Sequence, residues 1–114
     1  QRQRAALART LMEDRPVVLM DEPFSALDAI TRARLQSLAA ILLAGRTVLL
    51  VTHDPLEALR LGHRIQIMAG LPARIEAEIR PDGTPPRDLR DAALLALQGE
   101  LLAHLADAQG ALAA

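Results

Sequence analysis

The sequence predicts an α/β fold, because three features follow one another along the chain. A wholly apolar run covers Val17–Met20, helical periodicity covers Thr31–Ala44, and a second apolar run covers Thr47–Val51. Short apolar runs that contain β-branched residues are typical of strands covered on both faces of a parallel sheet. Strand, helix and strand at this spacing form a βαβ unit, so we expect parallel strands joined by a right-handed crossover.

Helical segments are expected on both sides of this unit. Leucines at helical spacing predict a helix from Gln1 to about Asp14, which ends before Pro16. A short helix is expected over Pro55–Leu61, because a proline is well tolerated in the first turn of a helix. Asp54 precedes that proline and is expected to cap the helix.

The last third of the chain predicts a hairpin, a loop and a long helix. The segments Arg64–Met68 and Ala73–Arg80 are strand candidates, and residues 69–72 between them predict the turn of a hairpin. PDGTPPRD, residues 81–88, has the composition of a loop. Leucines at three- and four-residue spacings from Asp88 to about Ala108 predict an amphipathic helix.

Composition limits what these elements can do. The chain has 114 residues and is 51% hydrophobic, which is enough for one domain with a core. Its net charge of −1 gives no electrostatic basis for nucleic-acid binding, so no nucleic-acid partner is expected. The absence of cysteine excludes a disulfide framework and fits a reducing compartment. The chain begins at Gln1, inside a helical pattern, which predicts that it is a fragment.

Two acids and a histidine follow the two predicted parallel strands. Asp21 and Glu22 come directly after the first strand, and His53 follows the second. The carboxyl ends of parallel strands meet at one edge of a sheet, where ligands usually bind. Carboxylates can hold magnesium and orient a water, and a histidine can donate to a phosphate, which together suit nucleoside triphosphate hydrolysis. The structural alternatives are a helix-capping turn for the acids and an ordinary polar position for the histidine.

Several motifs in order resemble the ATP-binding subunits of ABC transporters. VVLMDE resembles the Walker B motif, SALD the D-loop, LLVTHD the H-loop, and QRQRAALART the helix after the LSGGQ signature. The resemblance implies a partial P-loop NTPase (ABC ATPase) domain with a parallel βαβ core, a C-terminal β-hairpin and a final helix. It also implies the C-terminal part of the ATPase domain at 1–80, a linker at 81–87, and an amphipathic C-terminal helix and tail at 88–114.

The resemblance gives each candidate residue a role towards ATP and Mg²⁺. Glu22 would be the catalytic carboxylate that polarises the attacking water, and His53 would contact the γ-phosphate of ATP. Asp21 would support the magnesium ion through water. The other positions implied to contact nucleotide or to couple two ATP sites at a dimer interface are Gln1, Ser25 and Asp28.

The function implied is ATP hydrolysis that powers import of a small solute across the cytoplasmic membrane. THDPLEAL is similar to importer-type subunits, and HRIQIMAGLPARI resembles the nitrate, sulfonate and taurine group. The implied partners are transmembrane permease subunits, a second identical ATPase subunit and a periplasmic or extracellular solute-binding protein. The implied location is peripheral, on the cytoplasmic face of the inner membrane.

The chain also departs from this family. It contains no G-x-x-x-x-G-K-[ST] loop, no Gln-bearing loop and no Leu-Ser-Gly-Gly. We therefore expect the 114 residues alone to be inactive and to leave apolar surface uncovered. Two alternatives stay open: an ABC-type ATPase of DNA repair or chromosome maintenance, and an inactive truncated gene product.

Overall fold

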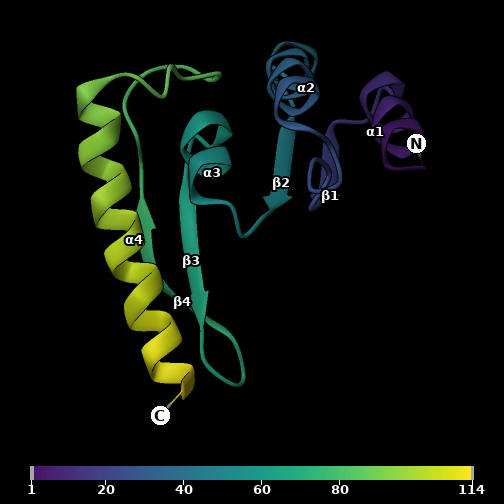
Figure 1. Ribbon diagram of the computed structural model, residues 1–114. Coiled ribbons are helices and arrows are strands. Elements are labelled where there is room, and N and C mark those ends of the chain that lie inside the picture. The colour runs from purple at the N-terminus through teal and green to yellow at the C-terminus, as the bar shows by residue number, and fades with distance from the viewer. Residues whose placement is uncertain (1, 114) are drawn as a thin grey trace. The chain divides into compact units, whose positions relative to one another are not determined.

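The computed structural model describes residues 2–113, and it describes side chains for residues 4–108. The chain divides into two compact units, one that ends at His53 and one that begins at Asp54. The first unit contains a parallel pair of strands and the second an antiparallel pair (Figure 1). The α/β class, the parallel pair, the hairpin and the final helix predicted from the sequence are thus confirmed.

Two helices and two strands build the first unit. They are α1 (Arg2–Met12), β1 (Val17–Asp21), α2 (Ala29–Leu42) and β2 (Thr47–Val51). β1 pairs with β2 in parallel, from Val17 opposite Thr47 to Asp21 opposite Val51. The two strands therefore end side by side, and the residues that follow them start from the same edge.

α2 begins two residues earlier than its periodicity predicts, because Asp28 caps it. The Asp28 backbone is extended, and its carboxylate accepts hydrogen bonds from the Thr31 N–H and hydroxyl, both at 2.9 Å. A carboxylate at this position satisfies a backbone N–H that would otherwise lack a partner in the first turn. The helix therefore starts at Ala29, directly after the cap.

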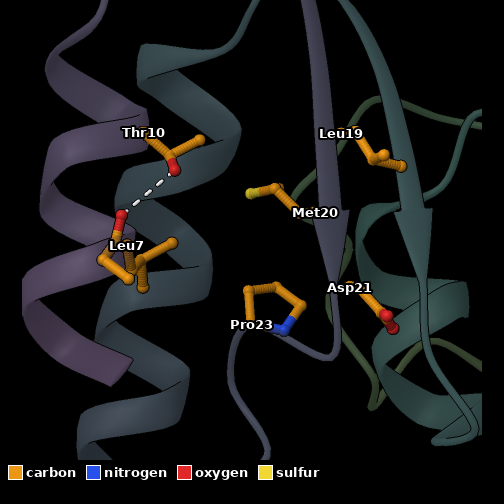
Figure 2. Close-up of a pocket in the computed structure, with 7 residues that line it drawn as sticks. Leu7, Thr10, Leu19, Met20, Asp21 and Pro23 are labelled. Carbon is orange, nitrogen blue, oxygen red and sulfur yellow. Dashed lines mark hydrogen bonds between the residues drawn. The ribbon is translucent and has the colours of Figure 1, made fainter. Parts of the chain in front are cut away.

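The two faces of β1 differ in exposure. Val18 and Met20 are buried, and Figure 2 shows Met20 pointing towards the side of Leu7 on α1, with Leu19 pointing the opposite way. Leu19 is 68% exposed, and Leu49 of β2 is 60% exposed. The prediction of strands covered on both faces is therefore wrong for the described residues, since one face has no covering element. The predicted uncovered apolar surface is confirmed.

The second unit packs a hairpin against a long helix. It contains α3 (Pro55–Leu61), β3 (Ile65–Ala69), β4 (Arg74–Ile79) and α4 (Ala92–Ala113), and α4 runs along the hairpin (Figure 1). Asp54 caps α3 as predicted, because its carboxylate accepts a hydrogen bond of 3.0 Å from a main-chain N–H of the first turn. The core side chains are Leu59, Ile65, Ile67, Ile79, Leu94 and Leu101.

α4 begins four residues later than predicted and extends further. The Asp91 carboxylate accepts the Ala93 N–H at 2.8 Å, and this local bond fits a helix that starts at Ala92. Asp88, where the helix was expected to begin, instead accepts the Arg90 N–H at 2.9 Å in a preceding turn. No helix of the described residues has the length and apolar character to cross a membrane.

The segment 81–87, predicted as a linker, is anchored by a buried arginine. Arg87 is 8% exposed, and its main-chain N–H donates to the carbonyl of Arg60 in α3 at 2.9 Å. Its guanidinium donates five hydrogen bonds of 2.5–3.2 Å to main-chain carbonyl oxygens. Burial lowers the pKa of Arg87, and nearby Asp82 opposes that shift. The acceptors are the carbonyls of Leu59, Gly62, Pro81, Asp82 and Gly83.

Candidate functional site

Glu22 and His53 meet at the carboxyl edge of the parallel pair. The Glu22 N–H donates to the Val51 carbonyl at 2.8 Å and so extends the pairing of β1 with β2 by one bond. The His53 N–H donates to Glu22 Oε1 at 2.9 Å, and the His53 ring nitrogen Nδ1 pairs with the same oxygen. The convergence expected from the strand order is therefore confirmed for these two residues.

The backbone of Glu22 is in the left-handed region, with φ of 49°. No other non-glycine residue among those described has a positive φ. Such a conformation is costly for a residue with a Cβ, and it persists where its surroundings fix it. Here the Glu22 N–H is held by β2, and the Glu22 carbonyl accepts from the Ser25 hydroxyl at 3.1 Å. The chain therefore turns sharply at Glu22, with the carboxylate beside the end of β2.

The Glu22–His53 pair is open to solvent on the histidine side. The His53 side chain is 88% exposed and the Glu22 side chain is 27% exposed. Pairs as exposed as this contribute about 0–1 kcal/mol, because water screens them and their side chains lose entropy. A ligand can therefore take over either partner at small cost.

Asp21 is the last residue of β1, and its side chain is exposed. No group of three or more His, Cys, Asp or Glu residues within the described part could hold a metal ion. This arrangement fits magnesium, which proteins usually hold with one or two carboxylates while waters and substrate phosphates complete the octahedron. It does not fit a cation held by protein ligands alone.

Residues 22–28 form a turn, here called the 22–28 turn, that links β1 to the cap of α2. The Phe24 side chain is fully buried and anchors the middle of the turn, whereas Ser25 is exposed. Hydrogen bonds from the Thr31 N–H, and then from its hydroxyl, lower the pKa of the Asp28 carboxyl. Asp28 thus carries a capping role that the sequence analysis did not assign to it.

Arg32 is a residue of this region that sequence reasoning missed. From the first turns of α2, its Nε donates to the Phe24 carbonyl at 3.2 Å and its Nη2 to the Leu27 carbonyl at 2.7 Å. Helical side chains lean towards the N-terminus of their helix, so an arginine four residues after a cap can reach the turn before it. That spacing was the available signal, but main-chain acceptors leave no pattern in a sequence.

Comparison with known proteins identifies the family. The chain is 52% identical over 112 residues, 96% of its length, to an uncharacterised ABC transporter ATP-binding protein of Haemophilus influenzae, of which it covers 47%. It is 48% identical over 114 residues to an aliphatic sulfonates import ATP-binding protein of Rhodococcus jostii, covering 98% of this chain and 46% of that one. A taurine import ATP-binding protein of Roseobacter denitrificans is 52% identical over 80 residues, 68% of this chain and 30% of that protein. No protein-family model matches the chain.

The chain belongs to the ABC transporter ATP-binding proteins. It spans less than half the length of the curated relatives described here. VVLMDE and LLVTHD, the segments that resemble the Walker B motif and the H-loop, contribute the two residues that meet at the strand ends, Glu22 and His53. Gln1, the position expected to belong to the signature, lies outside the described residues.

A hollow of about 180 Å³ lies between α1 and the end of β1 in this ABC protein (Figure 2). Its lining includes one carboxylate, Asp21, and no basic side chain. Phosphate groups are bound by cationic side chains or by clusters of N–H donors. The hollow therefore does not form a phosphate site by itself, and the Glu22–His53 edge remains the candidate site.

Proposed function

We propose that the chain carries the hydrolytic edge of an ABC importer ATP-binding subunit, and that the whole protein hydrolyses ATP to power import of a small solute. The observation that carries this proposal is the joining of Glu22 and His53 at the ends of two parallel strands. Relatives named as import ATP-binding proteins support it. Their names give no support to the alternative of a DNA-repair ATPase.

The chemistry assigned to this edge follows from the exposure of its groups. Glu22 orients the attacking water and accepts its proton, because its carboxylate is partly exposed and already fixed by the His53 N–H. The exposed His53 ring donates to a γ-phosphate oxygen and helps stabilise charge there. Asp21 would hold the magnesium ion, and the ion would neutralise charge on the phosphates when it is bound.

The proposed partners and solute rest on the relatives' names. Two of them are named for aliphatic sulfonates and for taurine, which share a sulfonate group. We therefore assign a small solute that carries a sulfonate group. The proposal includes permease subunits, a solute-binding protein, and a second copy of the ATPase that meets Gln1, Ser25 and Asp28 across the ATP sites. The protein would lie peripherally on the cytoplasmic face of the inner membrane.

The test is Glu22→Gln in the whole protein, since this change removes the base and keeps the shape. We expect ATP hydrolysis to fall about 100-fold or more, while ATP-bound dimers persist in size-exclusion chromatography. Glu76→Gln, an exposed acid on β4, is the matched control and should leave hydrolysis unchanged. Hydrolysis near the wild-type rate in Glu22→Gln would contradict the assignment of Glu22 as the base.

A further inference from the structure

We propose that Arg32 is a positioning residue for the 22–28 turn, and that it sets the rate of hydrolysis without contacting nucleotide. This inference rests on the proposed function for its effect on hydrolysis, but not for its effect on the turn. The guanidinium lies half-buried on α2 and donates to two carbonyls of the turn, those of Phe24 and Leu27. It therefore ties the turn to the helix that follows it.

Two main-chain hydrogen bonds within the turn are long. The Ser25 N–H reaches the Glu22 carbonyl at 3.4 Å, and the Leu27 N–H reaches the Phe24 carbonyl at 3.3 Å. Backbone hydrogen bonds are usually 2.9–3.0 Å long and weaken beyond that. The Arg32 bond to the Leu27 carbonyl is 2.7 Å and carries a charged donor, which makes such bonds stronger than neutral ones. Of these hydrogen bonds to carbonyls of the turn, the one from Arg32 to Leu27 is the shortest.

The turn also begins with a strained residue. Glu22 has its positive φ at the point where β1 ends, and strain of this kind persists only where neighbouring structure over-determines it. β2 fixes the N–H side of Glu22 through the Val51 carbonyl. On the other side the chain is fixed by buried Phe24 and by Arg32, which holds the Phe24 carbonyl. Loss of Arg32 would remove one of these two restraints and let Glu22 and Ser25 move further.

The first test measures mobility of the turn directly. The chain contains no cysteine, and Ala26 is an exposed residue of the turn, so Ala26→Cys provides a site for a nitroxide spin label. In the whole protein with this single labelled cysteine, Arg32→Met should increase the mobile fraction of the spectrum, and Arg32→Lys should give an intermediate value. Arg34→Met, at an exposed position on the same helix, is the matched control and should change nothing. An unchanged spectrum in Arg32→Met would overturn the proposal.

The second test measures hydrolysis by the unlabelled variants. Arg32→Met should lower kcat about 10- to 100-fold, since small displacements of a catalytic group cost that much. Its KM for ATP should stay within about twofold, because no group that touches nucleotide is removed. Arg32→Lys should recover part of kcat, since lysine keeps the charge but loses the fork of donors. A raised KM with unchanged kcat would mean that Arg32 binds nucleotide directly, against the proposal.

The two readouts separate the possible failures. If the wild-type whole protein does not hydrolyse ATP, the proposed function fails, while the spin-label spectra still decide whether Arg32 holds the turn. If Arg32→Met does not fold, Arg32→Lys decides alone: wild-type mobility together with wild-type kcat in that variant would overturn the proposal. Raised mobility with lowered kcat would support it.

Discussion

Two segments of this protein are each held by one arginine, and they differ in what the arginine leaves exposed. Arg87 is 8% exposed and donates five guanidinium hydrogen bonds to carbonyls around the 81–87 segment. A guanidinium has five N–H donors, so this group is saturated by its own chain. Arg32 is half-buried and donates to two carbonyls of the 22–28 turn.

The difference shows how one type of interaction can serve structure or chemistry. Around Arg87 the protein supplies an acceptor for every guanidinium N–H. Two of these acceptors are carbonyls at the C-terminal end of α3, where cations are favoured. The 22–28 turn instead presents an exposed Ser25 and a Glu22 whose partner, His53, is 88% exposed. The 81–87 segment, here called the closed segment, stabilises the second unit. The 22–28 turn, here called the open turn, leaves polar groups exposed for a ligand.

The largest expected effect is on the closed segment. Arg87→Met removes the charged donor from two buried hydrogen bonds, those to the Leu59 and Pro81 carbonyls, so the free energy of unfolding of the second unit should fall by about 3 kcal/mol. Hydrogen exchange of the β3 and β4 amides would measure this. Arg90→Met is the control, since the Arg90 side chain is 91% exposed and its loss should leave the exchange of these amides nearly unchanged. Unchanged exchange in Arg87→Met would mean that the segment is not locked by this residue.

A smaller effect is expected at the cap that closes the open turn. Asp28→Ala removes the acceptor of the Thr31 N–H and should destabilise the first unit, which urea unfolding would show as a lower midpoint. Asp28→Asn should restore most of this stability, because asparagine caps helices as well as aspartate does. If hydrolysis by the whole protein is nevertheless lost in Asp28→Asn, the charge has a role beyond capping. Equal destabilisation by both changes would contradict the capping role.

The pH dependence of the same cap gives a finer test. The folded-state pKa of Asp28 is lowered, first by the Thr31 N–H and then by its hydroxyl. The stabilisation is therefore present above the unfolded pKa and is lost as the pH falls through the folded one. Thr31→Val removes only the hydroxyl, so an NMR titration should show the pKa of Asp28 rising part of the way towards 3.8. If the pKa of Asp28 does not rise in Thr31→Val, the Thr31 hydroxyl does not contribute to lowering it.

The smallest effect is expected next to the closed segment. Hydrogen bonds from the Arg90 side chain, and then its N–H, lower the pKa of Asp88 from 3.8 to about 2. The associated stabilisation is lost as the pH falls from about 4 to about 2, and it is slight because both side chains are exposed. In Arg90→Met the NMR titration of Asp88 should move back towards 3.8. A pKa that stays near 2 would show that Arg90 is not the cause.

The fold was predictable where side-chain pattern and topology decide it. Apolar runs predict β1 and β2, and the parallel pairing expected of them predicts that Glu22 and His53 meet at one edge, as they do. The hairpin and the cap at Asp54 followed from alternation and from residue type in the same way.

Two kinds of feature could not be predicted from the sequence: hydrogen bonds to main-chain carbonyls, and the question of which element covers each face of a strand. The acceptors of Arg32 and Arg87 are carbonyl groups, which every residue carries, so no residue type signals them. The exposed face of β1 was not predicted, because an apolar run shows only that a strand prefers apolar contacts. It does not show whether the chain supplies an element to cover both faces. The start of α4 depended on whether Asp88 or Asp91 capped it, and both are suitable residues.

The edge formed by Glu22 and His53 is tested most directly by a structure of the whole protein carrying Glu22→Gln, with ATP and magnesium. We expect the γ-phosphate to contact the His53 ring and to lie beside the side chain of residue 22, with the metal between Asp21 and the phosphates. ATP bound with its phosphates away from these strand ends would contradict the assignment of this edge as the site of hydrolysis.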